Sequence, residues 1–164
     1  MSFKETYYRY YPELVRYGRH LLEDEAGTED LVQETFLRYH LELSKEPVIE
    51  NSRAWLYKVL HNLALSRNKS KRLHYSKLRR ISIADSGQDT LDQMAEKEKS
   101  ELVLQVLEQM PENEKKLLLL YHHGLKYKEM AEVLDINPKS IGTMLMRAIN
   151  KLKLLLKKEY HELF

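Results

Sequence analysis

Residues 126–147 have the sequence KYKEMAEVLDINPKSIGTMLMR, which predicts two short helices that meet at a tight turn. Apolar residues recur at helical spacing on either side of Asp135-Ile136-Asn137, where the pattern is interrupted. Pro138 suits the first position of a helix, because its missing N–H and fixed φ are tolerated there. Asn137 is a suitable N-cap, and Asp135 tolerates the left-handed conformation that such a turn needs.

The second of these helices has an apolar and a polar face. Its apolar positions, at steps of three and four residues, are Ile141, Leu145, Ala148, Ile149 and Leu152. Its polar positions are Lys139, Ser140, Thr143, Arg147 and Asn150. This is the pattern of a helix-turn-helix, whose second helix enters the DNA major groove. An αα-hairpin inside a helical bundle has the same period, so the motif favours DNA binding and leaves that alternative open.

Composition indicates an all-α protein of one or two domains. The chain has 164 residues, of which 43% are hydrophobic and 32% charged, and its 5 Gly and 4 Pro are too few for a many-turned β fold. The absence of Cys excludes disulfides, thiolate metal sites and Cys nucleophiles. The N-terminal sequence does not resemble a signal peptide, and no stretch is long enough to cross a bilayer. We therefore expect a cytoplasmic protein.

The N-terminal part predicts two amphipathic helices. The first would bury Phe3, Tyr7, Tyr11, Leu14, Val15, Leu21 and Leu22. The second, capped by Thr28, would bury Leu31, Val32, Phe36, Tyr39 and Leu43. On another face of the second helix lie Asp30, Gln33, Glu34 and Leu37. Taken alone, these acidic residues indicate an ordinary solvated surface.

A long basic segment follows. Between Asn51 and Ala84 there is no Asp or Glu, whereas nine basic residues accumulate: Arg53, Lys58, Arg67, Lys69, Lys71, Arg72, Lys77, Arg79 and Arg80. A run of one sign repels itself and normally has an anionic partner. We expect nucleic acid rather than a membrane, since no apolar insertion face accompanies the lysines.

The segment from Ser82 to Met94 is the best linker candidate, because it has little to bury. A helix is predicted to resume at Lys97, and another to start at Pro111 and stop at Gly124. The predicted organisation is an N-terminal helical domain over residues 1–80, a flexible linker over 81–98 and a C-terminal helix-turn-helix domain over 99–164.

In this order, the segments resemble the ECF-type (extracytoplasmic function) sigma factors of bacterial RNA polymerase, in the sigma-70 family. EDLVQETFLR (residues 29–38) is similar to the polymerase-binding helix of that family. RAWLYKVLHNLALSRNKSKR (residues 53–72) resembles its promoter-melting segment, and residues 110–152 resemble its C-terminal DNA-binding domain. The resemblance covers nearly the whole chain except the linker.

The resemblance implies a promoter-specificity subunit and assigns residues to its partners. Asp30, Gln33 and Glu34 would contact the clamp coiled coil of the polymerase β′ subunit, and the β flap is a further implied contact. Capture of the melted −10 element would involve Arg53, Trp55, Lys58, His61, Asn62, Arg67, Lys69, Lys71 and Arg72. The −35 duplex would be read by Lys139, Ser140, Thr143 and Arg147. A cognate anti-sigma factor is also implied.

One departure from the family affects the −35 reading. The family usually has a basic residue where this chain has Gly142, and often another where it has Met144. A glycine inside a helix costs roughly 1 kcal/mol relative to alanine and offers no side chain to a base. We therefore expect an unusual or weak −35 preference.

Two alternatives to a sigma factor are a stand-alone regulator and an enzyme. A stand-alone helix-turn-helix regulator would share the C-terminal half but would not need the acidic helix and the basic segment together. An enzyme acting on nucleic acid lacks support, because there is no Gly-rich phosphate loop and no clustered carboxylate pair. His122 and His123 are adjacent and would point apart on a helix, so no metal site is predicted there. No cofactor and no catalytic residue are predicted.

Overall fold

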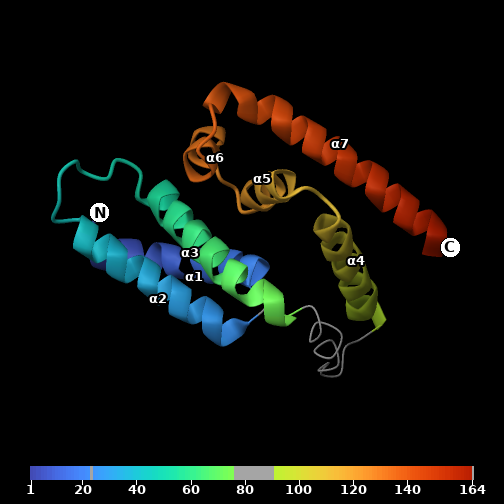
Figure 1. Ribbon diagram of the computed structural model, residues 1–164, viewed down its shortest axis with the longest axis horizontal. Coiled ribbons are helices and arrows are strands. Elements are labelled where there is room, and N and C mark those ends of the chain that lie inside the picture. Colours follow the sequence, from blue (N-terminus) through green and yellow to red (C-terminus); the bar gives the residue numbers. More distant parts are fainter. Residues whose placement is uncertain (23, 76–90, 164) are drawn as a thin grey trace. The chain divides into compact units, whose positions relative to one another are not determined.

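The computed structural model describes residues 1–22, 24–75 and 91–163, and for residues 69–75, 91–95 and 162–163 it describes the backbone alone. All regular elements among these residues are α-helices, as the composition predicts (Figure 1). They are α1 (Phe3–Leu21), α2 (Glu25–Glu42), α3 (Ser52–Tyr75), α4 (Leu91–Glu108), α5 (Glu112–His122), α6 (Tyr127–Leu134) and α7 (Pro138–Leu163).

The helices group into two compact units. The first comprises residues 1–72 together with 119–141, and the second comprises 73–118 together with 142–164. Helix α4 begins at Leu91, before the predicted start at Lys97, so the last part of the predicted linker is helical. Residues 76–90, which hold the rest of the linker, and the basic residues Lys77, Arg79 and Arg80 lie outside the described residues. The domain boundaries at 80 and 99 stay a prediction.

In the first unit, α1, α2 and α3 lie side by side (Figure 1). Helix α1 starts with a capping box that the sequence analysis missed. The Ser2 hydroxyl accepts from the Glu5 N–H at 3.2 Å, and the Glu5 carboxylate accepts from the Ser2 N–H at 2.7 Å. Gly18 lets α2 approach closely, because a Cβ atom added at this position would lie 2.8 Å from Thr28 Cγ2.

Two details of the predicted helices were wrong. Helix α2 begins at Glu25, and Thr28 is not its cap, since its hydroxyl instead donates to the Asp24 carbonyl at 2.9 Å inside the first turn. Leu43, expected in the core, is 45% exposed because it lies beyond the end of α2.

The buried face of α1 is rotated relative to the prediction. It consists of Thr6, Tyr10, Leu14, Tyr17 and Gly18. Tyr7 and Tyr11 are half-buried at its edge, where the Tyr7 ring lies 4.8 Å from that of Phe36. Across from them, Val32, Phe36 and Tyr39 of α2 and Leu56, Tyr57 and Leu60 of α3 complete the core. Most of these core residues have large aromatic or aliphatic side chains, whose burial is the main stabilising term.

Candidate nucleic-acid interface

The helix-turn-helix has the predicted turn. Asp135 adopts φ 56° and ψ 49°, in the left-handed region, and the N–H of Ile136 donates to the Ala131 carbonyl at 2.9 Å. The Asn137 side-chain oxygen accepts from the Lys139 N–H at 3.0 Å, which caps α7 ahead of Pro138. The prediction of helix, turn and capped second helix is confirmed.

Helix α7 places the four predicted −35 residues on its outer side. Lys139, Thr143 and Arg147 are exposed and Ser140 is half-buried, whereas Ile141, Leu145 and Ala148 are buried. Gly142 and Met144, where the chain departs from the family, are half-buried. The outer side of α7 therefore offers two cations and two hydroxyls at the start of one helix, the chemistry that base edges and phosphates require.

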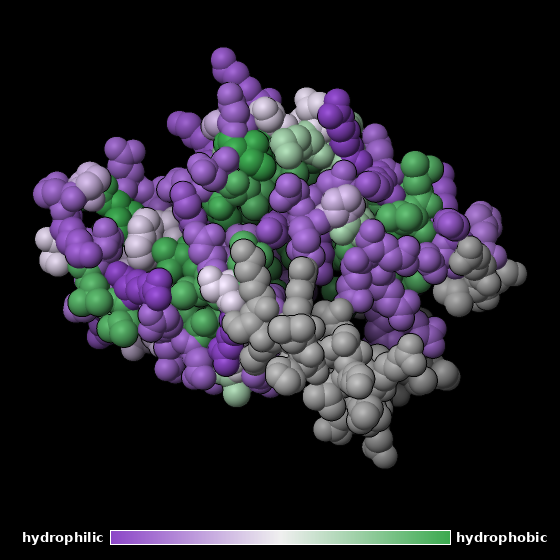
Figure 2. Space-filling model, in the orientation of Figure 1, coloured by the Kyte–Doolittle hydropathy of each residue, from purple (hydrophilic) through white to green (hydrophobic). Residues whose placement is uncertain are grey.

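The acidic face of α2 also carries exposed apolar residues. Asp30 and Gln33 are exposed, and the Glu34 carboxylate accepts from Arg38 at 2.8 Å one turn along. Leu37 and Leu41 continue this face and are 54% and 56% exposed. Figure 2 shows hydrophobic patches over the part of the molecule where Figure 1 places α2. An apolar centre with polar edges is typical of a protein interface.

Beside the start of α3 is a hollow of about 670 Å³. Trp55 lines it together with Pro47, Val48 and Ile49 of the preceding loop. Its walls also carry the carboxylates of Glu42, Glu50 and Glu132, with Lys128 as the one cation among the described lining residues. The resemblance also implies a role for the loop before Trp55 in −10 capture, but nothing in the sequence marks its individual residues or those of α6.

Of the predicted −10 residues, Asn62 is exposed and Lys58 and Trp55 are half-buried along α3. The Arg67 guanidinium donates to the Gly27 carbonyl at 3.0 Å. Lys69, Lys71 and Arg72 lie on the described backbone of α3, and their side chains are outside the described residues.

The prediction of a DNA contact by His61 was wrong. This side chain is 3% exposed, and its Nδ1 shares a hydrogen bond of 2.8 Å with the hydroxyl of buried Tyr17. Burial without a partner would cost a polar ring several kcal/mol, and Tyr17 supplies that partner. His61 is a core residue that joins α3 to α1.

Arg53, also predicted at the −10 site, is bound inside the first unit. Its guanidinium contacts the Glu13 carboxylate at 3.0 Å and donates to the carbonyls of His123 and Gly124 at 3.0 and 3.2 Å. The buried Glu129 carboxylate lies 3.5 Å away. The N-terminus of α3 is thereby connected to α1 and to the segment that leads into the helix-turn-helix.

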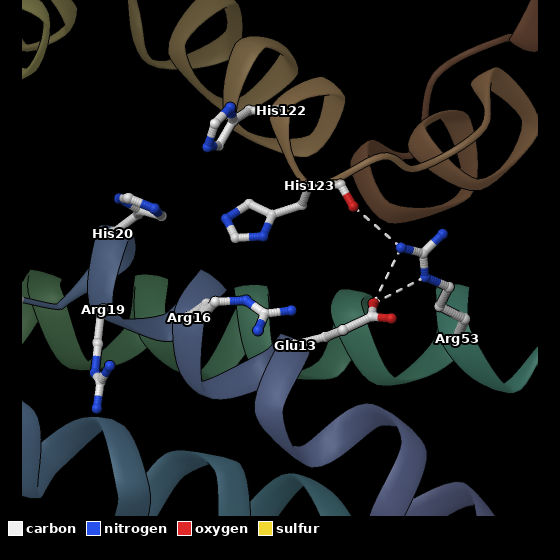
Figure 3. A pocket seen from close by; sticks show the side chains of 7 residues that line it. All are labelled: Glu13, Arg16, Arg19, His20, Arg53, His122 and His123. Atoms are coloured by element: carbon white, nitrogen blue, oxygen red, sulfur yellow. Dashed lines mark hydrogen bonds and ion pairs between the residues drawn. The ribbon is translucent and has the colours of Figure 1, made fainter. Parts of the chain in front are cut away.

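The adjacent histidines do not point apart as predicted. The ring centroids of His122 and His123 are 5.6 Å apart, and that of His20 lies 6.2 and 5.3 Å from them (Figure 3). Helix α5 ends at His122, so the angular step of a helix does not hold for His123. No group of three or more potential ligands among the described residues could hold a metal ion.

Burial, together with the smaller effects of the positive charges of His20, His122, Arg16 and Arg53, lowers the pKa of His123 from 6.5 to about 4. The neutral form is therefore favoured in the folded state, and its contribution to stability is present above pH 6.5. We expect the free energy of unfolding to decrease as the pH falls from about 6.5 towards 4. Denaturant titrations at several pH values across this range measure the free energy of unfolding and check the prediction.

The matched variants are His123→Gln, which removes the titrating group, and His161→Gln at an exposed histidine of α7. His123→Gln should flatten part of the pH profile and His161→Gln should not. The prediction is contradicted if both variants keep the wild-type profile.

Two family profiles match separate parts of the chain. Sigma-70 region 2 matches residues 6–74, and sigma-70 region 4 matches residues 100–152. The chain belongs to the sigma-70 family, as an ECF-type sigma factor. Such a factor directs RNA polymerase to promoters, and the alternative of a stand-alone regulator is not favoured.

The similar proteins agree with this assignment. The ECF RNA polymerase sigma factor SigM of Bacillus subtilis is 26% identical over 94% of this chain and 95% of its own. Two solved structures share the fold at 22% identity each. CnrH in complex with the cytosolic domain of CnrY has a TM-score of 0.69 and covers 95% of this chain and 88% of its own. The sigma factor RpoE of Bartonella quintana, with the anti-sigma factor NepR, has a TM-score of 0.67 and covers 94% and 96%. None of the described helices has the length and apolar composition of a membrane span.

Proposed function

We propose that this sigma factor uses three separate surfaces, one for each partner. The acidic face of α2 binds the polymerase, α3 with its preceding loop holds the melted −10 strand, and the outer side of α7 reads the −35 duplex. The observation that carries the proposal is the confirmed turn before α7, which leaves Lys139, Thr143 and Arg147 exposed together behind a capped helix start.

For the −10 element, the hollow beside Trp55 suits a base rather than the phosphate backbone. Its aromatic and apolar lining can stack on a base, whereas Glu42, Glu50 and Glu132 repel phosphate. The basic side of α3, with Lys58 and exposed Asn62, takes the backbone of the strand.

For polymerase binding, Asp30, Gln33 and Glu34 share a face of α2 with its exposed apolar residues Leu37 and Leu41. The likeness of the fold to a sigma factor bound to its anti-sigma factor supports a cognate anti-sigma partner for this chain as well. The factor acts without catalytic residues or a cofactor, in the cytoplasm, as a subunit of the polymerase.

A run-off transcription assay with purified core polymerase tests the function. Specific transcripts from a promoter library are expected only when the protein is added. Sequence-specific DNA binding by the protein alone, without transcripts and without co-purification with core polymerase, would instead support a stand-alone regulator.

Replacing Arg147 by alanine should weaken binding to the −35 duplex. Arg147 is exposed on the outer side of α7, and a side chain that contacts a base contributes about 1–3 kcal/mol. Titration of polymerase-bound protein with the duplex at fixed salt measures the effect. Lys158→Ala, at an exposed lysine near the end of the same helix, is the control. Equal affinity of the Arg147 variant and the wild type would remove Arg147 from the site.

A further inference from the structure

A pocket of about 370 Å³ in the first unit has no role in the proposed function. Helix α1 contributes Arg16 and His20 to it, α3 contributes Arg53, and the end of α5 contributes His122 and His123 (Figure 3). Figure 3 shows the three imidazoles around an open space, with the Arg16 side chain passing below His123 in this view. Its volume lies at the lower end of the range for small-molecule sites.

The carboxylate that lines this pocket already has partners within the protein. Glu13 is the one carboxylate among the described residues that line it, and its Oε2 accepts from Arg53 at 3.1 Å and from the Tyr57 hydroxyl at 3.1 Å. Arg19 pairs with Glu25 at 2.8 Å and extends away from the histidines in Figure 3.

Two polar groups of the pocket have no ion-pair or hydrogen-bond partner among the described residues. Arg16 is exposed, and within the described part of the chain no carboxylate forms an ion pair with it. The Nε2 atom of His123 is buried and has no hydrogen-bond partner among the residues that the structure describes. A buried polar atom of this kind costs free energy unless a ligand or water satisfies it.

Stabilisation of helix ends accounts for only some of the cationic side chains that line the pocket. Arg19 and His20 lie in the last turn of α1 and His122 in the last turn of α5, where cations offset the helix dipole. Arg16 lies a turn earlier and Arg53 comes from another helix, so neither is needed for this purpose.

Burial is the main cause of the lowered pKa values of two histidines in the pocket, and neighbouring positive charge adds to it. The pKa of His20 is lowered by burial and by His122, and that of His123 by burial and four cationic neighbours. The groups that face His123 are Glu13, Arg16, Tyr17 and His20 of α1, Arg53 and Tyr57 of α3, and His122 of α5. A bound anion would favour protonation of these imidazoles.

We propose that this pocket binds a small phosphate-class anion, such as pyrophosphate or a small phosphorylated metabolite, through Arg16 and the imidazoles of His20, His122 and His123. The arginine offers planar paired donors, and each protonated imidazole offers a charge-assisted hydrogen bond. The bound anion joins α1 to the segment that leads into the helix-turn-helix. This site goes beyond promoter recognition, and its test needs neither polymerase nor DNA.

Isothermal titration of the full chain with inorganic pyrophosphate, at constant ionic strength, tests the proposal. We expect saturable binding that is tighter at pH 6 than at pH 8, because binding is coupled to proton uptake by the histidines. Loss of the charge-assisted contact in Arg16→Gln should weaken binding roughly tenfold. Lys4→Gln removes an exposed cation of α1 that does not line the pocket and should leave binding unchanged.

A histidine variant and a second anion test which side chains and which anion chemistry are responsible for the binding. His123→Gln should remove part of the pH dependence, and circular dichroism shows whether each variant is folded. Sulfate in place of pyrophosphate shows whether a single tetrahedral anion is enough. No saturable binding, or equal weakening by Arg16→Gln and Lys4→Gln, would overturn the proposal.

Discussion

Reversing the charge of Asp30 and Glu34 together, as Asp30→Lys with Glu34→Lys, is expected to abolish binding to core polymerase. Both residues lie on the outer face of α2, one turn apart, beside the exposed Leu37 and Leu41. Like charges brought together across an interface cost several kcal/mol. A loss of about 3 kcal/mol corresponds to a weakening of roughly a hundredfold.

The fold should survive this change. Glu34 forms only an exposed pair with Arg38, and such pairs contribute about 0.3–0.5 kcal/mol. A pull-down with core polymerase measures binding, and circular dichroism checks folding. The matched control is Glu98→Lys with Glu101→Lys, which reverses two acidic residues one turn apart on α4. Normal polymerase binding by the folded α2 variant would return this face to an ordinary solvated surface.

Replacing Arg53 by alanine should strongly destabilise the first unit. The substitution removes the guanidinium that contacts Glu13 and donates to the carbonyls of His123 and Gly124. It also leaves the buried carboxylate of Glu129 without its nearest cation. Removing one partner of such a network is expected to cost about 2–4 kcal/mol, mostly through the polar groups left unpaired.

Two measurements separate this role from a contact with DNA. Denaturant unfolding gives the loss of stability, and hydrogen exchange over residues 119–141 should show faster opening of the segment that Arg53 holds. Arg53→Lys keeps the charge but not the planar fork, so only partial recovery is expected. A double-mutant cycle with Glu13→Gln isolates the pair itself. A loss below about 0.5 kcal/mol, the range of ordinary surface changes, would contradict the structural role.

Local patterns predicted the parts of this protein that depend on a few neighbouring residues. Asn137, Pro138 and Asp135 act through their own backbone and caps, and the turn they form is as predicted. The acidic face of α2 was also visible in the sequence, because residues three and four apart on a helix share a face. The proposal that this face binds polymerase rests on the resemblance to a family and not on its charge.

The sequence by itself therefore determined the helices, the helix-turn-helix and the order of the two family segments. The tertiary structure decided which polar side chains remain at the surface. Periodicity gives the face of a helix but not what packs against it. The resemblance to a family placed His61 on a DNA surface, whereas Tyr17, 44 positions away, holds it in the core. Arg53 likewise meets carbonyls 70 and 71 positions away. Such partners come together only when the helices pack, and burial then favours the hydrogen bonds formed inside over contacts with a ligand.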